Sequence, residues 1–138
     1  MLKGDKMIEN IIPGDFSSRG FFSPAKKIDM GNNYLIYVSG IQPYKEKTTN
    51  KCTTDDIATQ THQVFEQIGK ILKEAGATFD DIVKAVIYVT DMKDFDVISP
   101  IRAKYFEKSK PVSTLVEVNG FTHLGGKIEI EVTAVLNK

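Results

Sequence analysis

The sequence contains more apolar strand surface than its helices can cover. Residues 35–38 and 85–89 carry apolar side chains on both sides of an expected strand. Strands of this kind are normally covered on both faces of their sheet. Only residues 55–76 and 99–109 have helical character, and two helices can cover only one face of such a sheet. We therefore expect an α+β layer whose second face is buried by another copy of the chain.

The clearest single element is the segment 55–76. Its apolar residues recur at helical spacing and form one stripe, which is typical of an amphipathic helix packed on a core. Thr54 or Asp55 can cap its start. Gly76 stands where a left-handed C-terminal cap belongs.

The remaining elements follow from shorter patterns. The segment 99–109 is expected to be a helix with Ser99 as N-cap and Pro100 at the first helical position. Strands are expected at residues 35–38, 82–90, 111–118 and 127–136. Residues 1–20 are expected to form an irregular arm with room for a short strand. No linker or repeat divides the chain, so residues 1–138 are expected to form one domain.

Charge and cysteine content exclude several classes of protein. Lys plus Arg equals Asp plus Glu at 18 each, so the balanced charge argues against a dedicated nucleic-acid binder. No apolar run approaches the roughly 20 residues of a membrane helix, and no signal peptide is recognised. Cys52 is the only cysteine, so we expect a cytoplasmic protein in a reducing environment. His62 and His123 have no partners at metal-ligand spacing, so no metal site is expected.

Three sequence segments resemble one known family. They read "IDMGNNYLIYVSGIQP", "ILKEAGATFDDIVKAVIYVTDMKDF" and "VSTLVEVNGF…GKIEIEVTAV" and cover most of residues 28 to 136. In these segments the chain resembles the YjgF/Rid family, the reactive intermediate deaminases. The resemblance implies a chorismate-mutase-like α+β fold and a homotrimer whose sheets form a central barrel. It also implies ligand clefts between subunits and hydrolysis of reactive imines or enamines to keto compounds and ammonia, with no cofactor and no metal.

The same resemblance implies a set of site residues. Glu129 matches the glutamate thought to position the attacking water, and Ser39 and Gly40 match residues that line the cleft. In the well-characterised deaminases the strand that corresponds to residues 111–118 begins Pro-x-Arg-Ser, and the arginine pairs with the substrate carboxylate. Here Ser113 takes the place of that arginine and is followed by Thr114. A serine hydroxyl cannot replace the planar, bidentate guanidinium.

Two further positions depart from the family pattern. The family tyrosine near the N-terminal arm corresponds to Pro24, and the asparagine on the second helix corresponds approximately to Ser99. Arg19 on the arm and Arg102 on the second helix are candidates to supply the lost charge, although exposure to solvent is the default for both. His123, in the loop beside the site strand, is a candidate acid or base. We interpret His62 and Cys52 as surface and unreactive loop residues, respectively.

Three functions remain open from the sequence. The first is a diverged imine or enamine deaminase in which Glu129 orients water. The second is a non-catalytic or regulatory protein that binds a small metabolite in the same cleft. The third, RNA cleavage or inhibition of translation, ranks last, because the charge is balanced and no acid–base pair of His and Lys is visible.

Overall fold

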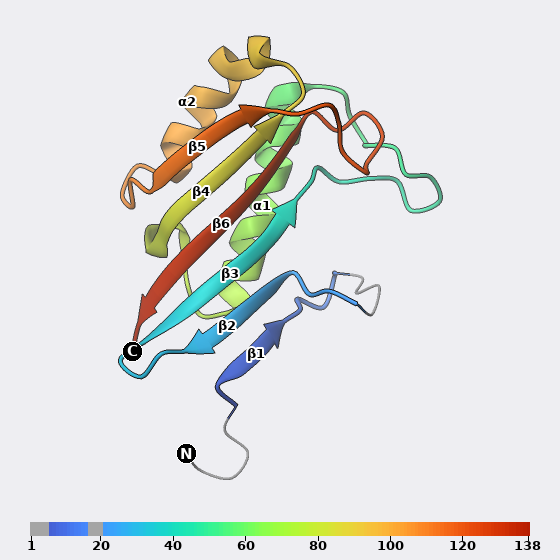
Figure 1. Ribbon diagram of the computed structural model, residues 1–138. Coiled ribbons are helices and arrows are strands. Elements are labelled where there is room, and N and C mark those ends of the chain that lie inside the picture. The colour runs from blue at the N-terminus through green and yellow to red at the C-terminus, as the bar shows by residue number, and fades with distance from the viewer. Residues whose placement is uncertain (1–5, 17–20) are drawn as a thin grey trace.

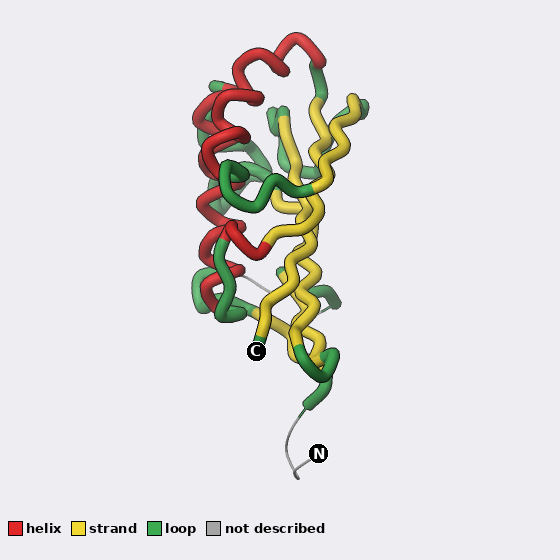
Figure 2. Tube along the Cα trace, turned by 90° about the vertical axis from the view of Figure 1, so that its left-hand side faces the viewer, coloured by secondary structure: helices red, strands yellow, loops and turns green. Residues whose placement is uncertain are grey.

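The computed structural model describes residues 6–16 and 21–138 and shows a six-stranded sheet with two helices on one face (Figures 1 and 2). The mixed α+β architecture expected from the sequence is therefore confirmed. The strands are β1 (Ile8–Ile11), β2 (Ala25–Asp29), β3 (Asn33–Ile41), β4 (Ile82–Val89), β5 (Val112–Glu117) and β6 (Ile128–Asn137). The helices are α1 (Ile57–Glu74) and α2 (Phe95–Tyr105), with single 3₁₀ turns at η1 (Phe79–Asp81) and η2 (Met92–Asp94).

Strand β6 lies inside the sheet, whose order is β1-β2-β3-β6-β4-β5. It pairs antiparallel with β3 on one side and with β4 on the other. The edge strand β5 pairs parallel with β4, after the crossover through α2. The C-terminal ends of strands β3, β4 and β5 therefore all lie at the same end of the sheet as the start of β6 (Figure 1).

The core lies between the sheet and α1. Residues Ile128, Ile130, Val132 and Ala134 of β6 alternate toward the helices and are buried. Opposite them, the apolar stripe of α1 is completely buried at Val64, Phe65, Ile68, Ile71 and Leu72. Each large side chain buried in this way contributes about 1.5–3 kcal/mol relative to exposure. The Phe65 ring also stacks on Tyr105 with 4.2 Å between ring centroids, which joins α1 to α2.

The second face of the sheet carries apolar side chains that the described part of the chain leaves uncovered. Tyr37 is 51% exposed, Val116 39% and Val112 69%. In the view from the side, helices lie on one side of the sheet only (Figure 2). The expectation that both helices pack on one face is thus confirmed.

Two elements differ from the sequence-based prediction. Strand β2 was not expected, and it continues the sheet outward to β1, which lies within the arm predicted at residues 1–20. Helix α2 begins at Phe95, so Ser99 is not its N-cap, and Pro100 lies inside the helix. The η2 turn, which Asp91 caps, leads directly into α2 and starts the helical path before Ser99 is reached. A proline at this point removes only one helical hydrogen bond.

The ends of α1 show which capping signals were correct. Asp56, rather than Thr54 or Asp55, is the N-cap, and its carboxylate accepts hydrogen bonds from the backbone N–H and the hydroxyl of Thr59 at 2.9 and 2.7 Å. These bonds lower the pKa of the Asp56 carboxyl. The Gly76 prediction is confirmed, because this residue follows the helix with a φ of +86°, a conformation that favours glycine.

We expect Asp56→Ala to lower the free energy of unfolding by about 0.5–2 kcal/mol, because the cap bonds of α1 are lost. Chemical denaturation monitored by circular dichroism measures this change. The matched control is Asp55→Ala, which removes the neighbouring exposed carboxylate but not the cap. Equal losses for the two variants would contradict the assigned cap.

Candidate active site

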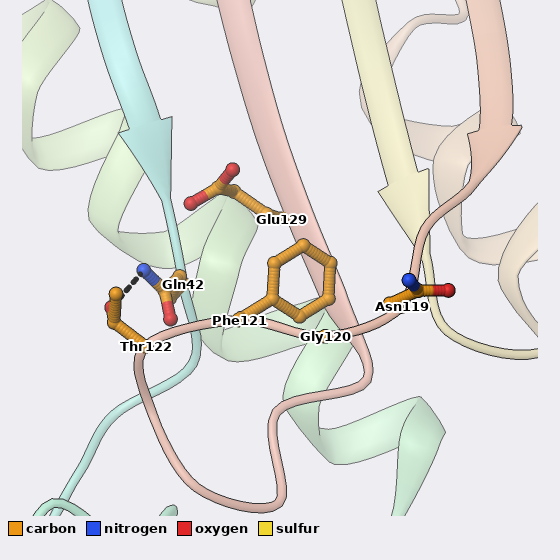
Figure 3. Close-up of a pocket in the computed structure, with 6 residues that line it drawn as sticks. All are labelled: Gln42, Asn119, Gly120, Phe121, Thr122 and Glu129. Carbon is orange, nitrogen blue, oxygen red and sulfur yellow. Dashed lines mark hydrogen bonds between the residues drawn. The ribbon is translucent and has the colours of Figure 1, made fainter.

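A pocket lies at the end of the sheet where β3 finishes and β6 begins. Its volume is about 500 Å³, and it is lined by Gln42, Asn119, Gly120, Phe121, Thr122 and Glu129 (Figure 3). Gln42 directly follows β3, and Glu129 is the second residue of β6. The other four residues belong to the loop that joins β5 to β6. The pocket therefore combines a carboxylate on a rigid strand with the polar and aromatic groups of one loop.

Gly40 and Glu129 fit closely against each other. A Cβ atom at Gly40 would lie 2.9 Å from Cδ of Glu129 and 3.1 and 3.2 Å from its two carboxylate oxygens. The Glu129 carboxylate thus packs against the backbone of β3 at Gly40. A residue with a side chain at position 40 would displace it. The sequence predicted both residues for the site, and the fold brings them together.

The surroundings of Glu129 favour the protonated form of its carboxyl. Burial is the main cause that raises its pKa above the ordinary value, and the negative charge of Glu131 raises it further. A hydrogen bond with the Gln42 side chain acts in the opposite direction. The net increase brings the pKa closer to neutral, which suits a group that accepts and returns a proton.

Glu131 lies two residues along β6 from Glu129 and on the same face of the sheet. It accepts a hydrogen bond from the hydroxyl of Tyr88, whose pKa this bond raises. In the sheet register Tyr88 is the direct partner of Glu129 on β4. The open face of the sheet therefore carries two adjacent carboxylates beside the pocket.

Two glutamine side chains hold the pocket loop in place. Gln42 donates to the hydroxyl of Thr122 at 2.9 Å and accepts from the backbone N–H of His123 at 2.9 Å (Figure 3 shows the first bond). Gln60, which is fully buried on α1, donates to the carbonyl of Gly125 at 2.9 Å and accepts from the N–H of Lys127 at 2.8 Å. The loop is thus attached to β3 and α1 before it enters β6.

The other site residues predicted from the sequence are separated from Glu129. The hydroxyl of Ser39 donates to the carbonyl of Ser23 at 3.2 Å. Ser113 pairs with buried Ala85, so its side chain is on the helix side of the sheet, opposite to Glu129. Thr114 is on the same face as Glu129 but pairs with Val86, which in turn pairs with Glu131. One chain alone therefore does not bring Ser113 to the pocket.

Two of the three additional charged candidates, Arg102 and His123, have contacts outside the pocket lining. Arg19 is outside the described residues. Arg102 on α2 stacks over the ring of Phe95, at 5.7 Å from the ring centroid. His123 is half-buried in the pocket loop, and its Nδ1 is 2.9 Å from the carbonyl oxygen of Pro43. These contacts give Arg102 and His123 positions in the fold without placing either among the residues that line the pocket.

Two of the remaining predictions concern residues outside the pocket. His62 is exposed, as expected, and its Nδ1 lies 3.0 Å from the hydroxyl of Tyr105. Cys52 is half-buried, and burial raises the pKa of its thiol, which lowers its reactivity.

In residues 6–16 and 21–138 no group of three or more His, Cys, Asp or Glu side chains could hold a metal ion. No helix in these ranges is long and apolar enough to cross a membrane.

Sequence reasoning missed four side chains of the pocket: Gln42, Asn119, Phe121 and Thr122. Two signals were available. Gln42 follows Gly40 by two residues, at the end of a strand already assigned to the site. The turn "NGFTH" follows the other assigned strand directly. What the sequence could not show is that the two strand ends meet at the same edge of the sheet.

These features define a small α+β protein with a carboxylate pocket at one edge of its sheet and an open apolar face. Comparison with known proteins gives the family. Residues 15–136 match the family model described as Endoribonuclease L-PSP. The chain therefore belongs to this family, which is the YjgF/Rid family that the sequence resembles.

Similar proteins cover nearly the whole chain. A RutC family protein of Pyrococcus abyssi is 36% identical over 114 residues, which are 83% of this chain and 85% of the relative. The 2-iminobutanoate/2-iminopropanoate deaminase of Bos taurus is 33% identical over 116 residues, or 84% and 80% of the two chains. A crystal structure of a YjgF/YER057c/UK114 family member from Mycobacterium tuberculosis superposes with a TM-score of 0.76 at 33% identity, covering 92% of this chain and 98% of the other.

We expect Glu131→Gln to lower the pKa of Glu129, because the substitution removes the negative charge that raises it. The measurement is an NMR titration of the Glu129 side-chain carboxyl carbon in the folded protein. Glu74→Gln, at the end of α1, is the matched control and leaves the titration unchanged. A Glu129 titration that is identical in wild type and Glu131→Gln would show that the two carboxylates are not coupled.

Proposed function

We propose that this protein is a hydrolytic deaminase that converts small reactive imines or enamines to carbonyl compounds and ammonia. The observation that carries the proposal is Glu129, a half-buried carboxylate with a raised pKa, which lines a pocket of suitable size beside polar and aromatic groups. The deaminase name of the bovine relative supports the same reaction class. The reaction consumes only water, so the proposal requires neither a metal nor an organic cofactor.

In the proposed mechanism, ionised Glu129 accepts a proton from a water molecule while the water oxygen bonds to the imine carbon. The imine reacts in its protonated form, so its carbon–nitrogen π electrons move to nitrogen and give the neutral amine of a tetrahedral intermediate. Glu129 then returns its proton to this amine. The carbon–nitrogen bond breaks, the hydroxyl oxygen forms the carbonyl, and the hydroxyl proton passes through Glu129 to the departing ammonia, which leaves as ammonium. The amides of Gln42 and Asn119 and the hydroxyl of Thr122 offer hydrogen bonds to the substrate.

The proposed active unit contains more than one copy of the chain. The apolar side chains on the open face of the sheet support assembly through that face, and we propose a homotrimer with the site between subunits. Ser113 cannot reach Glu129 of its own chain, because the two residues face opposite sides of the sheet. In the proposed trimer, Ser113 and Thr114 on the exposed edge strand β5 contribute to the pocket of a neighbouring copy.

We expect Glu129→Gln to reduce imine hydrolysis by about 10²–10⁴-fold, the usual contribution of a general base. The assay generates an imine in place with an oxidase and follows ammonia release above the uncatalysed rate. Glu74→Gln removes an exposed carboxylate at the end of α1, outside the pocket lining, and should retain the wild-type activity. Circular dichroism confirms that both variants are folded.

The same assay separates catalysis from simple binding. If the wild-type protein is stabilised by a small imine analogue but releases no ammonia above background, the protein is a metabolite-binding member of the family and not a deaminase. Equal ammonia release from wild type and Glu129→Gln would remove Glu129 from the mechanism.

We expect Tyr37→Asp to dissociate the proposed trimer, because it replaces an exposed aromatic side chain of the open face with a charge that the partner copy would bury. Analytical ultracentrifugation measures the oligomeric state. Val97→Asp is the matched control, because Val97 is similarly exposed, at 42%, but lies on α2 at the other face. A wild-type protein that sediments as a monomer would contradict the proposed assembly, as would a Tyr37→Asp variant that remains trimeric.

A further inference from the structure

We propose that the pocket takes imines without a carboxylate, bound as cationic iminium ions, in preference to 2-imino acids. This inference rests on the proposed function and adds the substrate class of the same site. The substrates would be imines formed by oxidation of simple amines. Hydrolysis of such an ion, R–CH=NH₂⁺ + H₂O, yields an aldehyde and ammonium, so atoms and charge balance without a further reactant.

The first argument is the charge of the pocket. Its six lining residues include one charged group, the Glu129 carboxylate, and no Lys or Arg. The charged neighbour that acts on Glu129 is also negative, since Glu131 lies beside it on β6. A substrate carboxylate would therefore enter a partly buried site next to like charges, and none of the described residues that line the pocket is a cation that could pair with it.

The second argument is the position of three lysines that lie on or close to strands β3, β4 and β6. Lys84 lies four residues before Tyr88, the partner of Glu129, which corresponds to a distance of roughly 13 Å along β4. Lys127 is closer in sequence to Glu129, but its charge acts on the pKa of Asp56 at the start of α1. Lys45, in the loop after β3, donates to Asn50 at 3.0 Å. These three lysines lie outside the pocket lining.

The edge strand that a neighbouring copy would bring does not restore a positive charge. Strand β5 reads "VSTLVE" from Val112 to Glu117 and contains no basic residue. Its only charged side chain, Glu117, accepts a hydrogen bond from the N–H of Met92 at 2.9 Å. Strand β5 of a neighbouring copy would therefore add no positive charge of its own to the pocket.

The same groups that repel a carboxylate can stabilise an iminium ion. Its positive charge is complementary to Glu129 and Glu131, and the ring of Phe121, which lies beside Glu129, offers a face for cation–π contact (Figure 3). Protonation also makes the imine carbon more electrophilic. Binding and activation of the substrate thus depend on the same charge.

The test uses two imines that differ only in the carboxylate. An amine oxidase converts 2-phenylethylamine to 2-phenylethan-1-imine, and an amino-acid oxidase converts phenylalanine to 2-imino-3-phenylpropanoate, with catalase present in both reactions. The quantity measured is kcat/KM for carbonyl formation above the uncatalysed rate. We expect the carboxylate-free imine to be preferred at least tenfold.

A charge introduced into the pocket tests the cause of this preference. Asn119 is exposed and lines the pocket, so Asn119→Arg adds a cation to the pocket lining without disturbing the core. We expect this variant to shift the ratio of the two kcat/KM values at least tenfold toward the imino acid. Val97→Arg adds the same charge to the exposed surface of α2 and should keep the wild-type ratio.

The outcomes distinguish the inference from the proposed function. If wild type hydrolyses the imino acid at least as well as the carboxylate-free imine, the inference is wrong and the deaminase proposal stands. If wild type accelerates hydrolysis of neither imine, the deaminase proposal and the inference fail together. An unchanged ratio in Asn119→Arg would show that charge in the pocket does not set the preference.

Discussion

The alternation of side chains along β6 is the constraint on which the rest of the structure depends. Each second residue of this strand is apolar and buried against α1, so the strand cannot slip by one position without exposing the core. The same register directs Glu129 and Glu131 to the opposite face. Core packing and placement of the carboxylates are therefore fixed by one strand register.

The Glu129 carboxylate lowers the stability of the folded protein when it is ionised, which is the form that the proposed mechanism uses. The pKa of Glu129 is higher in the folded protein than in an unfolded chain, mainly because of burial. Its contribution to stability is therefore favourable below the unfolded pKa and is lost as the pH rises through the folded pKa. Above its folded pKa, Glu129 is an ionised, half-buried carboxylate that lowers the stability of the folded chain, which is common for functional groups.

The sequence was sufficient for elements with strong local patterns and insufficient for arrangements that depend on distant parts of the chain. The stripe of α1 and the glycine after it predicted a helix correctly, as did the apolar runs for β3, β4 and β5. Strand β2 was missed because "AKKID" carries two adjacent lysines and has no apolar alternation. The start of α2 was misplaced because Pro100 was taken for the first helical residue.

For the site, too, the sequence served better for residues on strands with strong local patterns than for arrangements that depend on distant parts of the chain. Gly40 and Glu129 were both predicted for the site, and the structure brings them into contact because β3 and β6 are paired neighbours in the sheet. The placement of Ser113 depends on which face of an edge strand it occupies, and that is fixed by the parallel pairing with β4. The pocket residues of the loop 119–122 could not be assigned, because a loop carries no periodic signal that relates it to a distant strand.

The buried amide of Gln60 determines when the pocket loop becomes ordered. It binds the carbonyls of Thr54 and Gly125 and the N–H of Lys127, so the loop 119–126 is joined at its far end to the first turn of α1. A loop attached in this way loses its conformational freedom when the chain folds, and little of that entropy remains to be lost when a ligand arrives. The loop that lines the pocket is therefore already ordered before a ligand binds. Its loss of conformational entropy belongs to folding and not to binding.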